Sequence, residues 1–177
     1  MKGPTEKPRK RRDFIFFLSS LAATLGWLGF IYSNSLKSAP ESGEQSSRVL
    51  ALIRSLARFV GYEGEVTEHF VRKLAHFTEF AILSLLVCLS VFTLWRVLHK
   101  ETASRDVRPL LWVSMPLCML LASVDEWLQT FSDGRAAELA DVLLDTCGAA
   151  LATLCLQGLI TFCLFVRKNT KNREKDV

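Results

Sequence analysis

The chain has 177 residues, of which 50% are apolar and 23% are charged, and its formal net charge is +4. An apolar share this large favours a membrane protein over an ordinary soluble domain. The sequence contains no glycine-rich phosphate loop, nucleophile elbow or dinucleotide fingerprint, and its basic residues lie at the ends of apolar runs, which argues against a nucleic-acid partner.

The first membrane span is expected at residues 14–32. Residues 1–13 carry six Lys and Arg residues and predict a disordered basic tail. The nineteen residues that follow contain no charge, enough for a helix to cross about 30 Å of hydrocarbon. A cleaved signal peptide is the alternative, but its apolar region would be shorter, so a membrane anchor is favoured.

An amphipathic helix is expected at residues 46–60, after a polar, turn-rich connection at residues 33–45. Apolar residues recur at helical spacing in this segment, opposite Arg54 and Arg58. The segment is too short and too charged to span a membrane, and Gly61 follows it. We therefore predict an interfacial helix that lies on the outer side of the membrane.

Three further spans are expected at about residues 74–95, 110–128 and 142–166. A basic loop separates the first two of these, and a Ser132-Asp133-Gly134 turn precedes the last one. Residues 167–177 form a second basic tail. The predicted fold class is all-α, an integral membrane four-helix bundle with one additional short amphipathic interfacial helix on the outer side, and residues 14–166 make up the membrane domain.

The distribution of basic residues predicts the orientation. Fifteen Lys and Arg residues lie in the two tails and in the loop after the second span, against seven in the other two connections. Basic residues concentrate on the cytoplasmic side. Both termini are therefore expected in the cytoplasm, and the protein is expected to be a multi-pass protein of the cell membrane.

Charged and strongly polar residues in and at the ends of the expected spans then converge on the outer leaflet. They comprise Lys73, His76 and Glu79 in the second span, Asp125, Glu126 and Gln129 in the third, and Asp141 and Asp145 in the fourth. Charged groups near lipid are costly, so they should share an interior. Spacings of three and four residues place the members of each group on one helix face, and we expect a single pocket.

Two carboxylates four residues apart, such as Asp141 and Asp145, need a positive partner. Arg135, Lys73, a protonated His76 and a divalent metal are all candidates. The sequence identifies no cofactor and leaves the presence of a metal open.

Candidate roles follow from the residue types. His76, Glu79, Asp125 and Glu126 are candidates for acid/base catalysis, and Lys73, Gln129, Arg135, Asp141 and Asp145 are candidates for ligand binding. Structural alternatives stay open. His76 can be a buried histidine bonded to a neighbouring helix, Arg135 can snorkel or pair with Asp133, and the two aspartates can simply tie the fourth helix to its neighbours. Asp125 is expected to face inward because Gln129 shares its helix face.

Two segments resemble the VanZ-like family of small bacterial membrane proteins. They are RKLAHFTEFAIL, at residues 72–83, and DEWLQTFSDGRAAELADVLLDTCGA, at residues 125–149. They match the family's K-x-x-H-F-x-E-[YF], D-E-x-x-Q-x-F-x-x-G-R and D-V-x-x-D-x-x-G patterns. Phe80 here follows the glutamate of the first pattern, which leaves no phenol at that position. The resemblance implies a link to teicoplanin resistance, and hence a membrane lipid, a lipid-linked cell-wall precursor or the glycopeptide drug as a partner.

Three functions remain open from the sequence. The favoured one is a VanZ-like protein that affects susceptibility to teicoplanin-type lipoglycopeptides through a lipid-linked envelope component. The second is an acid/base or metal-assisted enzyme that acts on a phosphate-bearing or acylated lipid. The third is a proton-coupled transporter or accessory subunit, which ranks last because the expected polar groups occupy only one half of the bilayer.

Overall fold

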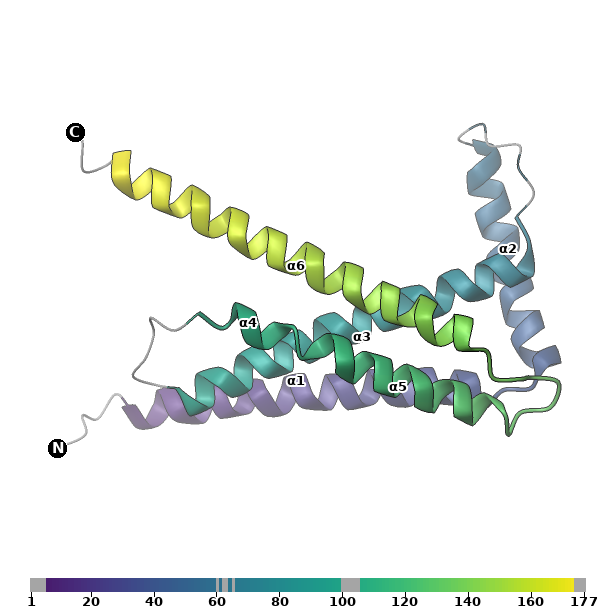
Figure 1. Cartoon of the computed structure of the whole chain (residues 1–177), viewed down its shortest axis with the longest axis horizontal. Helices are drawn as coiled ribbons and strands as arrows, with labels where there is room; N and C mark the ends of the chain where they lie inside the picture. Colours follow the sequence, from purple (N-terminus) through teal and green to yellow (C-terminus); the bar gives the residue numbers. More distant parts are fainter. Residues whose placement is uncertain (1–5, 60, 62–63, 65, 100–105, 174–177) are drawn as a thin grey trace.

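The computed structural model describes residues 6–59, 61, 64, 66–99 and 106–173, and these residues form helices and connections without any strand. The helices are α1 (Glu6–Ser35), α2 (Ala39–Phe59), α3 (Glu68–Leu98), α4 (Arg108–Leu111), α5 (Ser114–Gln129) and α6 (Leu139–Arg173) (Figure 1). Four helical segments are long and apolar enough to cross a membrane, at Arg11–Ser35, Glu68–Leu98, Arg108–Gln129 and Leu139–Thr170. The predicted all-α multi-pass architecture, with an additional helix, is confirmed.

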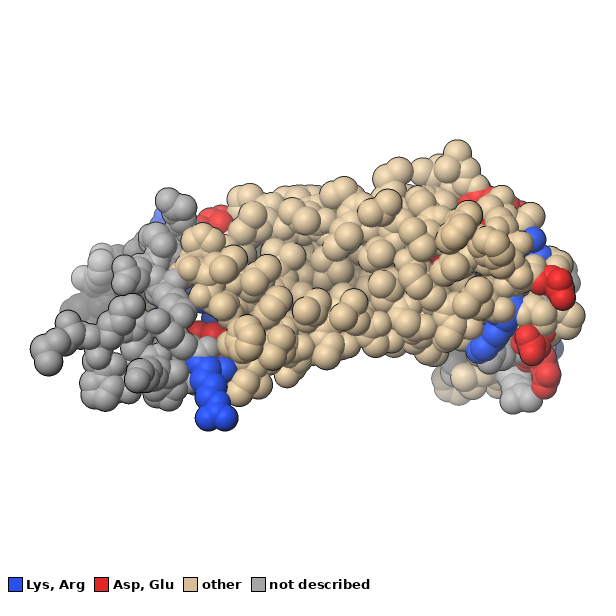
Figure 2. Space-filling model, turned by 90° about the horizontal axis from the view of Figure 1, so that it is seen from below, with Lys and Arg blue, Asp and Glu red and all other residues tan. Residues whose placement is uncertain are grey.

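The chain reverses direction at each end of the bundle. The start of α1, the end of α3, α4 and the end of α6 lie at one end of the molecule, and α2 and the α5–α6 loop lie at the other (Figure 1). We call this second end, formed by α2 and the loop at residues 130–138, the α2 end. Figure 2 shows a broad belt without Lys, Arg, Asp or Glu between charged groups at the two ends. Such a belt matches the hydrocarbon layer of a bilayer.

Several helices are longer than the sequence predicts. α1 begins at Glu6, inside the segment expected to be a disordered tail, and α6 continues to Arg173 through much of the second tail. α2 begins at Ala39 and takes in part of the expected polar connection. Hydropathy marks only the apolar part of a helix, whereas Lys, Arg and Glu extend helices well. Residues 1–5, 174–177 and Val60, for which tails and a helix end were also predicted, lie outside the described residues.

α3 lies at the centre of the bundle and packs against α1, α5 and α6. The apolar core joins Ile31 of α1, Phe80 and Leu83 of α3, Ala122 of α5 and Ala149 of α6, all fully buried. Polar side chains also join the helices in this interior. Thr153 of α6 shares hydrogen bonds of 2.7 and 2.8 Å with Ser84 of α3 and Ser114 of α5. Hydroxyl groups inside a bundle satisfy each other in this way because lipid offers them no partner.

α2 lies across the other helices rather than alongside them (Figure 1). Its Leu50 is buried with Val66 and Val71 at the start of α3, and the Arg54 side chain donates hydrogen bonds to the Val66 carbonyl oxygen. This crossing arrangement agrees with the predicted interfacial helix. The side of the membrane that the α2 end faces stays a prediction from the charge distribution.

Asp13 lies in α1 near the end of the bundle opposite α2, although the sequence assigned it to the tail. Its side chain is buried and accepts a hydrogen bond of 3.0 Å from the Arg96 guanidinium of α3. This ion pair therefore joins α1 to α3 far from the α2 end.

Candidate functional site

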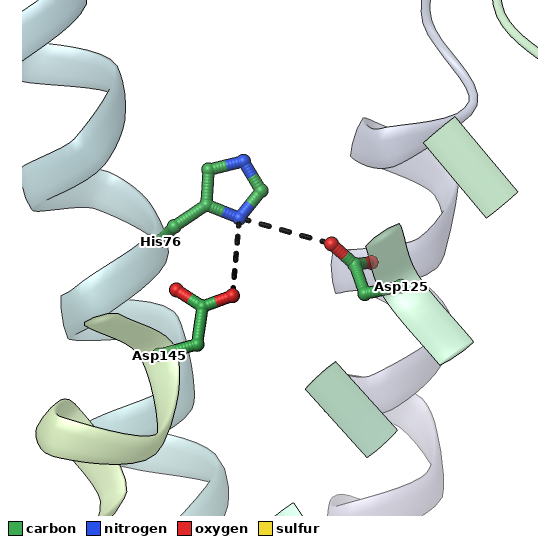
Figure 3. Close-up of side chains that lie close together, drawn as sticks. All are labelled: His76, Asp125 and Asp145. Carbon is green, nitrogen blue, oxygen red and sulfur yellow. Dashed lines mark ion pairs between the residues drawn. The ribbon is translucent and has the colours of Figure 1, made fainter. Parts of the chain in front are cut away.

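Three helices bring His76, Asp125 and Asp145 together near the α2 end (Figure 3). His76 Nδ1 lies 3.8 Å from Asp125 Oδ2 and 3.9 Å from Asp145 Oδ2. Asp125 and Asp145 are fully buried, and the His76 side chain retains 15% of its exposure. The three residues come from α3, α5 and α6, so the packing of these helices creates the cluster. We call them the His76 cluster.

Several polar atoms of the His76 cluster have no hydrogen-bond partner within the described part of the chain. They are His76 Nδ1, Asp125 Oδ1 and both carboxylate oxygens of Asp145. Most buried polar groups in proteins are hydrogen-bonded, so four unpaired atoms in one place require an explanation such as a bound water, ion or ligand. The same three residues offer one ligand atom each for a metal ion, and these atoms lie within 4.8 Å of one another.

Gln129 connects the two adjacent acidic residues of α5. Its Nε2 donates to Asp125 Oδ2 at 3.1 Å and to Glu126 Oε1 at 2.7 Å. Asp125 faces the His76 cluster, as its shared face with Gln129 suggested. Glu126 is also buried, but its other oxygen accepts a hydrogen bond of 2.8 Å from the Glu138 backbone N–H. Glu126 therefore holds the α5–α6 loop and does not face His76.

The two aspartates near the start of α6 have different partners. Lys73 donates a hydrogen bond to Asp141 Oδ1 and lies 3.7 Å from Glu138 Oε2. Asp145 faces His76 instead. Of the two aspartates, only Asp141 has Lys73 as its positive partner. Asp145 has His76 as its neighbour instead.

Arg135 joins three parts of the α2 end. Its guanidinium donates to the Ser35 carbonyl oxygen at 3.2 Å, to Ser42 Oγ at 2.6 Å and to Gln129 Oε1 at 3.4 Å. Burial lowers the pKa of Arg135 from its usual value, and the nearby positive charge of Arg72 lowers it further. The guanidinium nevertheless stays charged, because an arginine pKa in proteins remains far above neutral pH.

The turn before Arg135 directs its side chain inward. Gly134 has a φ of 76°, a left-handed conformation that glycine adopts without strain. The Arg135 N–H donates to the Ser132 carbonyl oxygen, and Ser132 Oγ donates to the Ser35 carbonyl oxygen at 3.1 Å. The predicted turn therefore positions Arg135, and among the described residues its bonds go to Ser35, Ser42 and Gln129 rather than to Asp133.

Glu79 is not part of the His76 cluster, although it lines the same cavity as His76. Its Oε1 accepts a hydrogen bond of 3.4 Å from Asn34 Nδ2, and its backbone carbonyl accepts one of 2.9 Å from Trp27 Nε1. An α-helix has 3.6 residues per turn, so residues spaced three apart do not stay in line along its surface. Over the six residues from Lys73 to Glu79 the side-chain direction changes from α6 to α1. The residues of the predicted stripe therefore contact different helices: Lys73 contacts α6, His76 lies near α5 and α6, and Glu79 contacts α1.

Two cavities meet at the α2 end. The first, here called the apolar groove, has a volume of about 430 Å³ between α1, α2 and α3. Its apolar lining includes Trp27, Phe30, Val49, Ile53, Leu74 and Ile82. The second, here called the polar pocket, has about 220 Å³, and its lining includes His69, Lys73, Gln129, Glu138 and Asp141. Arg72, His76 and Arg135 line both cavities, so they form the border between them.

Sequence reasoning assigned no role to several residues that complete this site. Asn34, Ser35 and Ser42 belong to the polar segment after the first span, where no hydrophobic period fixes which side chain points inward. Arg72 lies at the start of the first segment that resembles the VanZ-like family, but no role was assigned to it. Residues 33–35 and 43–47, around the first three, are similar to the serine-rich connection that follows the first span in that family, and this likeness was their only signal.

Comparison with known proteins gives one result. A family model described as VanZ/LLP1 matches residues 17–163, which include all the predicted site residues. No match was found among curated proteins or among solved structures.

Proposed function

Because the chain belongs to the VanZ/LLP1 family, we propose that it binds a phosphate-bearing, lipid-linked component of the cell envelope at the α2 end. Through this component it affects susceptibility to teicoplanin-type lipoglycopeptides. The observation that carries the proposal is the shared border of Arg72, His76 and Arg135 between a polar pocket and an apolar groove. A lipid with an anionic head group and an apolar chain also has one polar and one apolar part, and each part matches one of the two cavities.

The polar pocket suits an anionic head group. Arg72, Lys73 and Arg135 bring three positive side chains to its lining, and an arginine fork matches the geometry of phosphate oxygens. Arg135 Nε is buried without a partner in the described part of the chain. Asp141 and Glu138 offset the charge of Lys73, which leaves the two arginines to meet the ligand.

The apolar groove suits a hydrocarbon chain. Its volume of about 430 Å³ lies within the range of small-molecule sites in proteins. Aromatic and branched side chains such as Trp27, Phe30 and Ile82 line it, and Glu79 is the acidic exception. A chain in this groove would pass between α1, α2 and α3, with its head group held at the border residues.

An enzyme is the second candidate. His76 lies at the border of both cavities, and its Nδ1 faces two carboxylates without forming a hydrogen bond among the described residues. An imidazole so placed beside a lipid phosphate or acyl group is suited to general acid/base catalysis. Proton transport has less support, because the described helices carry no Asp, Glu, Lys, Arg or His between the two ends, where Phe80 and Leu83 form part of the core.

Lipid binding by the purified full-length protein tests the proposal. Undecaprenyl phosphate and undecaprenol, which lacks the phosphate, would be titrated against the protein in detergent and followed by native mass spectrometry. We expect the phosphate to bind at least about tenfold more tightly, and Arg72→Gln to remove most of this advantage. Arg167→Gln, an exposed arginine near the end of α6 opposite the α2 end, is the control and should leave it unchanged.

Equal affinity for the phosphate and the alcohol would contradict a head-group site. The same variants, expressed in a susceptible host, test the second half of the proposal. The wild-type chain should change the teicoplanin concentration that stops growth, and Arg72→Gln should weaken this effect while Arg167→Gln keeps it.

A further inference from the structure

We propose that His76, Asp125 and Asp145 bind one divalent transition-metal ion of the Zn²⁺ or Mn²⁺ class. The site stands on the geometry of the His76 cluster alone and does not require the lipid proposed above. One imidazole and two carboxylates form a mixed nitrogen and oxygen ligand set. Imidazole suits Zn²⁺ and carboxylates suit Mn²⁺ and Zn²⁺, whereas Mg²⁺ and Ca²⁺ prefer oxygen ligands alone.

The two distances from His76 to the carboxylates are those of ligands that share an ion, and all three ligand atoms lie within 4.8 Å of one another. A direct hydrogen bond from His76 Nδ1 would need about 2.7–3.2 Å, and the two measured separations are 3.8 and 3.9 Å. Bonds of about 2.0–2.2 Å to one metal place neighbouring ligand atoms roughly 3.3–3.9 Å apart at coordination angles from tetrahedral to about 130°. The imidazole and each carboxylate already have this spacing.

Charge balance favours a cation at the same point. Asp125 and Asp145 are fully buried, and three of their four carboxylate oxygens have no hydrogen-bond partner among the described residues. Lys73 is bonded to Asp141, and Arg135 is bonded to Ser35, Ser42 and Gln129. A pair of buried carboxylates without a cation is strongly disfavoured, and a divalent ion compensates both.

The surroundings of the cluster match those of a metal site that remains accessible. Gln129 Nε2 donates to Asp125 Oδ2, the oxygen nearest His76, and such a neighbour orients a ligating carboxylate. His76 lines both cavities, which gives an ion a path from the surface. Three protein ligands also leave at least one coordination position open toward these cavities.

Metal binding by the purified full-length protein tests the proposal. After treatment with a chelator, the protein would be titrated with Zn²⁺ and Mn²⁺ separately by calorimetry, and bound metal would be counted by mass spectrometry after dialysis. We expect one ion per chain for at least one of the two metals. His76→Ala and Asp145→Asn should each weaken binding at least about tenfold, which is the lower end for disturbed metal sites.

His99→Ala is the matched control, because it removes the histidine at the C-terminal end of the same helix, away from the α2 end. It should bind metal as the wild type does. If His76→Ala does not fold, His76→Asp, which keeps a ligand at the position, should restore both folding and binding; if Asp145→Asn does not fold, Asp145→Glu should do the same. The metal should also raise the melting temperature of the wild type but not that of His76→Ala.

Two results would overturn the proposal. One is a wild-type protein that binds neither metal at a stoichiometry near one. The other is a folded His76→Ala variant that binds as tightly as the wild type. Because these measurements contain no added lipid, failure here leaves the lipid-binding result unaffected, and the two proposals are judged separately.

Discussion

Gly148 of α6 packs directly against the backbone of α3 at Phe77. A Cβ atom built on Gly148 would lie 2.3 Å from the Phe77 carbonyl oxygen, closer than any real side chain approaches. Phe77 is the neighbour of His76, and Gly148 lies one helical turn after Asp145. The close approach of these two backbones therefore sets how near Asp145 comes to His76.

The first prediction concerns this contact. Gly148→Ala should force α3 and α6 apart and lower the free energy of unfolding by about 1–3 kcal/mol, the usual cost of overpacking. Gly158→Ala is the control on the same helix, because no atom lies within 4 Å of its added Cβ. It should leave the melting temperature equal or higher, since alanine favours helix more than glycine does.

Thermal unfolding in detergent, followed by circular dichroism, measures both variants. If the His76 cluster holds a metal, Gly148→Ala should weaken metal affinity as well, while Gly158→Ala should not. Equal melting temperatures for Gly148→Ala and the wild type would show that the helices separate at little cost, and the contact would then lose its role in positioning Asp145.

A second prediction concerns the opposite end of the bundle. Arg96→Gln leaves the buried Asp13 carboxylate without its partner, so the variant should lose about 1–3 kcal/mol of stability. The double variant Asp13→Asn with Arg96→Gln removes both charges and should recover most of this loss. Arg108→Gln breaks the pair with Asp106, whose side chain is exposed, and serves as the control with a much smaller loss.

Denaturant titration in a fixed detergent compares the four proteins. A loss of similar size in Arg96→Gln and Arg108→Gln would show that Asp13 is well solvated without Arg96. Such a result would contradict the burial of the pair.

The sequence predicts the class of this fold, and it also predicts that His76, Asp125 and Asp145 come together. Long uncharged runs define the four spans because hydrocarbon excludes charge, and the chain reversals then bring residues of α3, α5 and α6 to one end. The convergence of His76, Asp125 and Asp145 follows from this topology and from helical spacing. Each of these inferences needs only the positions of residues along the chain.

The spacing of residues along the sequence does not show which partner each polar side chain contacts. Whether Lys73 meets Asp141, and whether Glu79 meets α1, depends on the rotation and tilt of α3 against its neighbours. Those angles are set by close contacts such as the one between Gly148 and the Phe77 backbone. No sequence pattern shows how close such a contact is. The roles of Ser35 and Ser42 were equally out of reach, because a polar connection has no period that reveals an inward face.

A third prediction tests the attachment of the α5–α6 loop. Glu126→Ala removes the acceptor of the Glu138 N–H, so this amide should exchange with deuterium faster by about tenfold, which corresponds to about 1–2 kcal/mol of lost protection. Glu138→Gln is a sharp control. It changes the side chain of the same residue but keeps the backbone N–H that Glu126 accepts.

Hydrogen–deuterium exchange of peptides that cover residues 130–140 measures this effect. We expect Glu126→Ala to differ from the wild type and Glu138→Gln to match it. Equal exchange in all three proteins would mean that the loop is held mainly by Arg135 and Ser132, and that burial of Glu126 serves another purpose.

The fourth prediction tests whether the apolar groove holds a lipid chain. Ile53 lines the groove from α2, so Ile53→Trp should fill part of its volume of about 430 Å³ and weaken undecaprenyl phosphate binding at least about tenfold. Leu52→Trp places the same side chain one position away, where Leu52 is 62% exposed and does not line the groove. Native mass spectrometry of both variants with undecaprenyl phosphate provides the comparison. Similar losses in the two would indicate a general effect of tryptophan on α2, whereas unchanged binding in Ile53→Trp would place the chain elsewhere on the protein.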